Sequence, residues 1–385
     1  MRRTTLRLIV VVVAVVALVP ITFVLFGLSV NRALEVKEAG DEPDDSFGLG
    51  CVAARPDSVT ELNQWLTRAR TVGSDVGADV GASVELSDGR SMWVFGDTIR
   101  AAGAAGPTMV RNSALIVDDE CVRTISTPDG GAVIPDAADG TGYWPVTIDH
   151  IAVEGGDRVA VGLFRVVGHG DGTWDFTTPG TALAEFWVPT GGTPELEQVV
   201  DVASTASDQT PAWGVAVVVR NRWIHVYGTS RPSDDSTGWA LHVARLKLPD
   251  ITDPTRWQYW DGRRWGDDPA ASAAIIPADG GVSRVLTVFR RDRHWYAVSK
   301  RNDFLGTDLV IWKGDAPQGP FVATPAALQI PSTPDNLQYM ALAHPHLLPE
   351  PGTVVVSWSR NGGGLDEIRA EPSRYRPVFA RVPLP

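Results

Sequence analysis

Residues 79–98 read DVGASVELSDGRSMWVFGDT. Within them, two segments in which apolar and polar residues alternate, 82–86 and 91–95, flank the dipeptide Asp88-Gly89. Alternation with a period of two around Asp-Gly is the strongest short-range signal of a β-hairpin, because this dipeptide fits the tight turn between antiparallel strands. The stretch therefore predicts a hairpin, the unit from which we expect the rest of the fold to be built.

An aspartate stands at each outer end of this hairpin, Asp79 before the first strand and Asp97 after the second. In an antiparallel pair these two ends lie side by side, so we expect the two carboxyl groups to meet at one rim of a sheet. Two neighbouring carboxylates push their pKa values apart, which separates an acid from a base. The plainer interpretation of Asp97 is a strand-end aspartate that closes a turn. Asp75, in the same Gly- and Asp-rich run, is an alternative to Asp79.

The rest of the chain repeats short apolar runs, with Gly, Pro, Asn and Asp between them. The runs occupy residues 113–117, 158–166, 183–188, 214–219, 223–227, 240–246, 284–289, 294–299, 309–312 and 353–358. Two pairs of runs read as further hairpins, 214–219 with 223–227 and 284–289 with 294–299. Helical periodicity is confined to one short helix over residues 62–70. Many short strands with regular turns predict a sandwich, a barrel or a propeller.

Three features favour a propeller. The chain is too long for one ordinary sandwich, and no obvious linker divides it. Hairpin pairs recur at intervals of roughly 60–70 residues, the scale of an elaborated four-stranded blade, and about five such blades fit the length. The strand-like segment 377–382 is expected to close the ring by pairing with a blade begun near the N-terminus. We therefore expect an all-β fold, a five-bladed β-propeller, with two separate β-domains as the alternative.

An uncharged apolar run, residues 8–30, follows a short segment that holds three arginines. As a helix this run is about 35 Å long, enough to span a hydrocarbon core of about 30 Å. Basic residues before it and acidic residues after it place residues 1–7 in the cytoplasm. We expect a single transmembrane helix as signal anchor at the cell membrane, an acidic stalk over residues 31–50 and an extracellular propeller domain over residues 51–385. A cleaved signal peptide is the alternative.

The composition limits the partners of the chain. The formal net charge is −12 and the acids are spread out, which argues against nucleic acid and anionic lipid as partners, since both require a basic face. Two cysteines are present, Cys51 and Cys121. Outside the membrane such a pair most simply forms one disulfide, and two separate buried thiols are the alternative.

A segment rich in aromatic and polar side chains, residues 142–150, reads GYWPVTIDH. Aromatic faces stack on the C–H faces of sugars, while Asp and His side chains bind hydroxyl groups. We expect Asp149 and His150 to bind a sugar, and Trp144 to serve both the substrate and the core. Asn112, at the start of an earlier strand, is expected either to bond a sugar hydroxyl or to cap a turn.

Two histidines, His344 and His346, stand two positions apart before the run at 353–358. In an extended segment they share one face. No third ligand of suitable spacing accompanies them, so the sequence does not predict a zinc site. We expect them to bond a sugar hydroxyl or a catalytic carboxylate.

Several of these motifs together resemble the DUF4185 family. They are Gly77-Ala78-Asp79, Ser87-Asp88-Gly89-Arg90, Trp93-Val94-Phe95-Gly96-Asp97-Thr98, Arg111-Asn112-Ser113, Tyr143-Trp144-Pro145, residues 257–265 and Ala343-His344-Pro345. The resemblance covers most of the extracellular part and implies a five-bladed propeller related in shape to furanoside-cleaving hydrolases. Members of that family are endo-D-arabinanases, which cut the D-arabinofuranose polymers of mycobacterial-type cell walls. The family's paired acids fall on Asp79 and Asp97, whereas its aromatic insertion after the first Asp is replaced here by Val80-Gly81-Ala82.

The residues and the resemblance together predict a membrane-anchored, endo-acting glycoside hydrolase that cleaves cell-wall D-arabinan. One of Asp79 and Asp97 acts as base or nucleophile, and the other as an acid with a raised pKa. The predicted substrate-binding residues are Asp75, Asn112, Trp144, Asp149, His150, His344 and His346. No cofactor is expected, and structural calcium is not indicated. The alternative is a catalytically inactive propeller that binds a glycan or a protein at the cell surface.

Overall fold

The structure, a computed structural model, describes residues 56–72, 75–118, 121–170, 174–204, 207–247, 253–362 and 364–385. These residues lie within Asp44–Pro385, the larger of the two units into which the chain divides. The predicted tail, anchor and stalk over residues 1–50 lie outside the described residues, as does Cys51, so the anchor and the disulfide stay predictions. Its predicted partner, Cys121, is buried. Within the described ranges no helix is long and apolar enough to cross a membrane.

The described residues form many strands and few helices, which confirms the all-β class. The strands are β1 (Asp75–Ala78), β2 (Ala82–Glu85), β3 (Ser91–Phe95), β4 (Thr98–Arg100), β5 (Met109–Val110), β6 (Ser113–Val117), β7 (Val122–Thr124), β8 (Gly142–Val153), β9 (Gly156–Gly168), β10 (Phe176–Pro189), β11 (Glu195–Ser204), β12 (Ala212–Arg220), β13 (Trp223–Ser230), β14 (Ala240–Lys247), β15 (Gln258–Trp260), β16 (Trp265–Gly266), β17 (Thr287–Arg291), β18 (His294–Lys300), β19 (Asp308–Gly314), β20 (Val322–Ala323), β21 (Leu328–Gln329), β22 (Leu337–His344), β23 (Thr353–Asn361) and β24 (Pro377–Pro383). The helices are α1 (Val59–Val72) and α2 (Leu365–Ala370), and the 3-10 turns are η1 (Pro254–Arg256), η2 (Pro269–Ala271) and η3 (Pro372–Arg374). Helix α1 includes the predicted helix and extends it at both ends.

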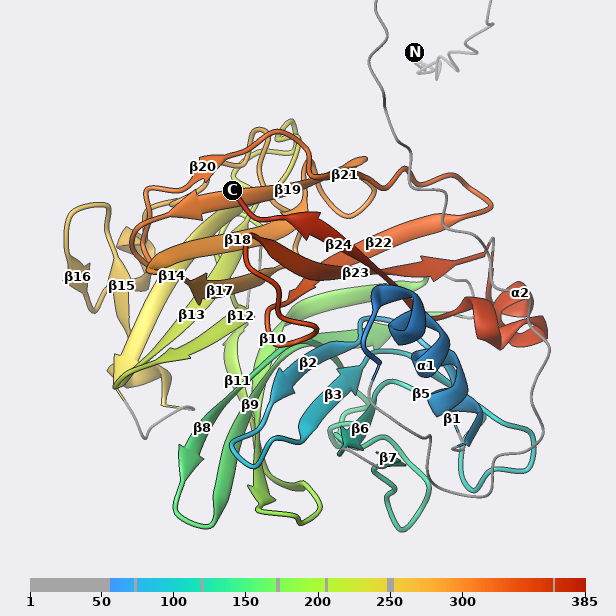
Figure 1. Ribbon diagram of the computed structural model, residues 1–385. Coiled ribbons are helices and arrows are strands. Elements are labelled where there is room, and N and C mark those ends of the chain that lie inside the picture. Colours follow the sequence, from blue (N-terminus) through green and yellow to red (C-terminus); the bar gives the residue numbers. More distant parts are fainter. Residues whose placement is uncertain are drawn as a thin grey trace, which may run out of the picture. The chain divides into compact units, whose positions relative to one another are not determined.

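The sheets follow one another along the chain, as the colours in Figure 1 show. Their strand orders are β2-β3-β6-β7, β8-β9-β10-β11, β12-β13-β14-β15-β16, β17-β18-β19-β20 with β21 on β19, and β22-β23-β24. The first strand of each sheet contacts the first strand of the next, and β22 contacts β2. Such a closed cycle of antiparallel sheets is the arrangement of a propeller. A further sheet, β1-β4-β5, is joined to the first of these sheets through the predicted hairpin.

Strand β12 lies between neighbouring sheets, since it contacts both β8 and β17. In β12 the first seven of nine residues are buried, which explains why this strand reads as a continuous apolar run rather than an alternating one. The packing brings two backbones into contact at Gly162 of β9. A Cβ there would lie 1.9 Å from the carbonyl oxygen of Gly214, so only glycine fits.

Three predicted hairpins are confirmed. In the first, Ala82 pairs with Val94 and β2 joins β3 through the turn at Asp88-Gly89. Gly89 has a φ of 83°, which glycine adopts without strain. The hairpins β12–β13 and β17–β18 also form as predicted.

The prediction for the C-terminal strand is wrong. Strand β24 pairs with β23, its neighbour in the same sheet, and not with a strand of the first sheet. The start of the described residues is instead joined to the last strand by helix α1, which packs on β24. The side chain of Asn63 bonds both the N–H and the carbonyl of Phe379, at 2.9 and 3.1 Å. The side chain of Asn63 therefore takes the place of the expected strand pairing. The alternation of apolar and polar residues in a strand does not predict such a contact.

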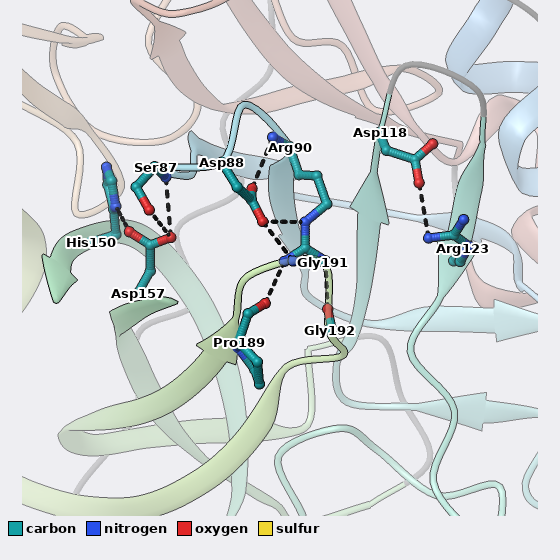
Figure 2. Close-up of polar contacts among 10 residues, drawn as sticks. All are labelled: Ser87, Asp88, Arg90, Asp118, Arg123, His150, Asp157, Pro189, Gly191 and Gly192. Carbon is teal, nitrogen blue, oxygen red and sulfur yellow. Dashed lines mark hydrogen bonds and ion pairs between the residues drawn. The ribbon is translucent and has the colours of Figure 1, made fainter. Parts of the chain in front are cut away.

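Arg90 joins the first hairpin to the next sheet, at the turn between β10 and β11 (Figure 2). Its guanidinium donates to the carbonyls of Pro189, at 2.7 Å, and Gly192, and to the carboxylate of Asp88, at 2.8 Å. Asp88 in turn accepts the N–H of Gly191 at 2.9 Å. Arg90 is 7% exposed, so these bonds are shielded from water.

Replacing this arginine, Arg90→Ala, is expected to lower the free energy of unfolding by about 2–4 kcal/mol, because it leaves two part-buried carbonyls without their donor and removes the cation that pairs with Asp88. The matched control is Arg123→Ala, which breaks the pair with Asp118 but removes a side chain that is 58% exposed. Exposed pairs contribute about 0–1 kcal/mol. Urea unfolding of both variants measures the difference, and equal losses would contradict the role given to Arg90.

Candidate active site

Asp79 and Asp97 lie where the first hairpin passes from one sheet into another. On one side Ala78 pairs with Thr98, between β1 and β4, and on the other Ala82 of β2 pairs with Val94 of β3. The two aspartates therefore fall between paired positions, and the structure brings them together as the hairpin predicts. They lie at a junction of two sheets and not at a free rim.

The backbone at this junction lets the Asp79 carboxylate approach closely. The N–H of Gly96 donates to the carbonyl of Asp79 at 3.2 Å. A Cβ on Gly96 would lie 2.3 Å from Oδ1 of Asp79, so any larger residue would displace the carboxylate. The glycine before Asp97 is thus required by the position of Asp79.

Val80, next to Asp79, has a φ of 66°, a conformation that β-branched residues rarely adopt. Such strain costs about 1–3 kcal/mol and persists only where the surroundings enforce it. Here the side chain of Val80 is fully buried, and its N–H donates to Oγ of Ser359 at 2.9 Å. The strained backbone turns the chain sharply at Asp79, and strain of this kind is typical of functional sites.

Tyrosines hold the Asp79 carboxylate. The hydroxyl of Tyr339 donates to Oδ2 of Asp79 at 3.0 Å. Burial, and then the negative charge of Asp79, raises the pKa of Tyr339 and of Tyr375 well above the usual range, so both hydroxyls stay protonated donors. Met340, with a φ of 54°, lies in the β-bulge that follows Tyr339 in β22. These donors hold the Asp79 carboxylate in place.

Asp97 has the opposite character. The pKa of Asp97 is raised to about 7, first by burial and then by the charge of Asp79, whereas the bond from Trp144 and the charge of Arg111 oppose the rise. The indole N–H of Trp144 donates to Oδ1 of Asp97 at 2.7 Å. Because Asp97 is only partly buried, it can exchange a proton with a ligand or with water. Near neutral pH the site thus holds a carboxyl group that can carry a proton beside a second carboxyl group that accepts the Tyr339 hydroxyl.

Aromatic side chains lead from Asp97 toward the surface. Trp144 meets Phe176 edge-on at 4.8 Å between ring centroids, Phe176 lies 6.4 Å from Trp174, and Trp174 lies 6.1 Å from Phe304. Trp174 is 58% exposed. Exposed aromatic faces beside a carboxyl pair are typical of sugar binding.

Two predicted substrate-binding residues have structural roles instead. Asp75 is 1% exposed and lies 3.6 Å from Nε of Arg100, so it neutralises a buried guanidinium. The amide of Asn112 accepts the N–H of Ile134 and donates to the carbonyls of Ile134 and Tyr143. These bonds leave Asn112 little capacity for a ligand, so the turn-capping interpretation is the better one.

Asp149 and His150 do not reach the carboxyl pair. Asp149 is five residues beyond Trp144 in β8, or roughly 16 Å along the strand. Its carboxylate accepts the N–H groups of Val219 and His150, at 2.6 and 2.8 Å. Burial raises the pKa of Asp149 to about 6 against these two bonds.

The ring of His150 is bound by the carboxylate of Asp157, which lies at the start of β9 and next to the turn of the first hairpin. Its Nδ1 lies 2.7 Å from Asp157, which also accepts the N–H and hydroxyl of Ser87 (Figure 2). This contact joins the turn after β2 to β9. His150 therefore holds in place the carboxylate that joins these two sheets.

The last predicted pair, His344 and His346, is held by serines. His344 lies 2.8 Å from Oγ of Ser83 and 2.7 Å from Oγ of Ser357, and His346 lies 3.3 Å from Ser83. Burial lowers the pKa of His344 well below its usual range and that of His346 to about 4, so both rings are neutral near pH 7. In the described part of the chain no three His, Cys, Asp or Glu side chains are grouped to hold a metal.

Sequence reasoning did not single out Tyr339 or Tyr375. Tyr339 stands inside a strand of ordinary apolar pattern, and Tyr375 follows the turn η3, more than 290 positions after Asp79. No local spacing links either one to an aspartate so far away. That these two tyrosines bind Asp79 can be seen only in the folded structure.

Solved structures of other proteins are similar to this chain. The "putative hydrolase" of Bacteroides ovatus ATCC 8483 is 19% identical over 91% of this chain and 96% of its own, with a TM-score of 0.60. An α-L-arabinanase mutant of Cellvibrio cellulosa is 12% identical over 81% and 93%, with a TM-score of 0.41. The catalytic domain of the Coprinopsis cinerea GH62 α-L-arabinofuranosidase is 11% identical over 80% and 90%, with a TM-score of 0.43. No curated protein matches the chain.

The resemblance to DUF4185 is wrong. The motifs that carried it are a hairpin end, an aromatic-proline step and a His-Pro step, which are short features of the strands and turns of an all-β fold. Such features recur wherever antiparallel strands and tight turns do. The family model that matches is "Domain of unknown function (DUF5005)", over residues 60–383, and the chain belongs to the DUF5005 family.

Proposed function

We propose that this protein is a glycoside hydrolase whose acid/base pair is Asp97 and Asp79. The observation that carries the proposal is the contrast within the pair. Asp97 has a pKa raised to about 7 beside a carboxylate that accepts a tyrosine hydroxyl. Two carboxyl groups in unlike environments are what glycoside hydrolysis requires.

In this mechanism Asp97 donates its proton to the glycosidic oxygen as the bond to the leaving group breaks. Asp79 acts as the base toward water or as the nucleophile toward the sugar. The bond from Trp144 fixes the orientation of the Asp97 carboxyl group, and Tyr339 fixes that of Asp79. The aromatic rings that lead to Trp174 offer faces on which sugar units can stack.

We further propose that the substrate is cell-wall D-arabinan, cut within the chain. The five sheets in a closed cycle support a five-bladed propeller, a shape that can bind a polysaccharide at one end of the ring. The uncharged run over residues 8–30 supports an enzyme held at the outer face of the membrane, where such a polymer lies.

One observation favours a second function, an inactive propeller that binds a glycan. Asp79 is only 8% exposed, so access of water or substrate to its carboxylate is narrow. In that case the exposed aromatic rings bind a sugar chain, and no bond is cut. Binding without new reducing ends would identify this function.

The test is incubation of the full-length protein with D-arabinan, L-arabinan and xylan, followed by sizing of the products. We expect oligosaccharides from D-arabinan and no change in xylan. Cleavage of L-arabinan alone would correct the substrate and keep the mechanism. An unchanged size of all three polymers, with retention of one of them on immobilised protein, would replace the hydrolase with the binding function.

A further inference from the structure

Three side chains near the candidate active site each keep at least one buried nitrogen without a hydrogen-bond acceptor. They are Arg231, Trp239 and Arg284, called here the donor cluster. Both guanidinium groups lie over the Trp239 ring, that of Arg284 at 4.8 Å from the ring centroid and that of Arg231 at 5.9 Å. Within the part of the chain that the structure describes, Nε of Arg231, Nε1 of Trp239, and Nε and Nη2 of Arg284 are buried without a hydrogen-bond partner.

The donor cluster adjoins the residues that hold Asp97. The guanidinium of Arg284 lies 4.7 Å from the ring of Phe164. Phe164 is the cross-strand partner of Trp144, whose indole N–H binds Asp97. Nη1 of Arg284 donates to Oγ1 of Thr178 at 2.9 Å, two residues beyond Phe176 in β10. A ligand that reaches Asp97 along the aromatic rings therefore passes close to Arg284.

The chemistry of the donor cluster calls for an anion. A buried cation with free N–H groups is unfavourable unless an acceptor neutralises it. Asp303 pairs with Arg231 at 3.5 Å, and Asp208 is exposed, so the cation that still calls for an acceptor is Arg284. Two rings flank the Arg284 guanidinium and hold its plane, as in sites where arginine binds a carboxylate.

The two free nitrogens of Arg284 also have the right geometry. Nε and one terminal nitrogen form the side of the guanidinium fork that binds both oxygens of a carboxylate at once. Nη1, the remaining nitrogen, is the one already bound to Thr178. Nη1 of Arg284 is therefore bound within the protein, while Nε and Nη2 have no hydrogen-bond partner among the described residues.

We propose that the donor cluster binds an acidic group of the glycan, a carboxylate carried by a sugar unit close to the one that contacts Asp97. The inference rests on the proposed function, since it names the substrate class of that same site. It adds to the proposed glycan a sugar unit that carries a carboxylate near the cleaved bond, with Arg284 as the residue that selects it.

The test uses two matched pairs of oligosaccharides and measures binding by calorimetry. One pair is D-arabinan oligosaccharides with terminal primary hydroxyls oxidised to carboxylates, and the unoxidised parent. The other is glucuronoxylan oligosaccharides and their carboxyl-reduced form. Full-length Asp97→Asn protein is used so that no bond is cut. We expect the acidic member of at least one pair to bind about tenfold to 100-fold more tightly than its neutral partner.

Variants then assign the preference to Arg284. Arg284→Ala is expected to abolish the ratio between acidic and neutral members, and Arg284→Lys to restore only part of it, because lysine keeps the charge without the fork. The control is Arg264→Ala, which removes a side chain that is 86% exposed and is expected to leave the ratio unchanged. Thermal unfolding confirms that each variant is folded.

Two results would overturn the inference: a ratio near one for both pairs, or an unchanged ratio in folded Arg284→Ala and Arg284→Lys. Because binding is measured without cleavage, the result is independent of the hydrolase proposal. A protein that prefers acidic glycans but cuts none would sink the proposed function and leave this inference intact. A protein that cuts neutral and acidic glycans equally would do the reverse.

Discussion

Asp97→Asn is expected to reduce hydrolysis of the substrate about a thousandfold, close to the full contribution of a general acid. The asparagine can still accept the Trp144 N–H bond through its Oδ1, so the geometry around residue 97 is kept while the proton is lost. The loss should fall on the rate of bond cleavage, with binding of the glycan little changed. It is measured as kcat and KM from the appearance of reducing ends.

The matched control is Asp366→Asn, which makes the same substitution at a fully exposed side chain on α2. It is expected to leave the rate within about twofold of the wild type, since a distant surface charge is screened by salt. A wild-type rate in Asp97→Asn would remove Asp97 from the mechanism. Equal losses in both variants would point to an effect of net charge instead.

The same substitution is expected to stabilise the protein at neutral and alkaline pH. The pKa of Asp97 is raised from its ordinary value of 3.8 to about 7 in the folded state, mainly because burial disfavours the charged form. The folded protein therefore holds a proton that the unfolded chain has already lost between these two pH values. The contribution of Asp97 to stability is complete below pH 3.8 and is lost as the pH rises to about 7.

An asparagine at this position does not titrate. The free energy of unfolding of Asp97→Asn, relative to the wild type, is expected to rise between about pH 4 and pH 7 and then level off. The rise is on the order of 4 kcal/mol, from about 1.4 kcal/mol for each unit of pKa shift. Urea unfolding across the pH range measures it, with Asp366→Asn as the control that shows no such rise. A difference that is flat with pH would show that Asp97 titrates normally.

The sequence was sufficient for the first hairpin and for what the hairpin brings together. The Asp-Gly turn and the period of two specify the pairing of β2 with β3, and the pairing brings Asp79 to Asp97. Both steps depend on residues within 20 positions of each other. Local patterns of this kind survive in the fold because tertiary packing reinforces them.

The sequence was insufficient wherever a role depends on a contact between distant segments. Asn112 and Asp75 looked like ligands of a sugar, but an amide and a carboxylate beside a strand serve equally well to bind backbone or arginine. His344 looked like a site residue, and the fold places it between two serines. Residue type alone cannot decide between a ligand and a buried partner, because both are hydrogen bonds of the same kind.

The same limit explains what sequence reasoning missed. Tyr339 and Tyr375 reach Asp79 from the last sheet, and Arg284 reaches the neighbourhood of Trp144 from the fourth sheet along the chain. These approaches follow from the closed cycle of sheets, in which the last sheet contacts the first. The sequence pattern of a single strand does not predict these contacts between sheets.

The central claim is that Asp79 and Asp97 act as one pair in which Asp97 holds the proton. Titration of the Asp97 carboxyl carbon by nuclear magnetic resonance, in the wild type and in Asp79→Asn, tests it most directly. We predict a pKa near 7 in the wild type and a lower one in the variant, where the neighbouring charge is gone and burial remains. An ordinary pKa in the wild type, or the same raised value in both proteins, would contradict the pair.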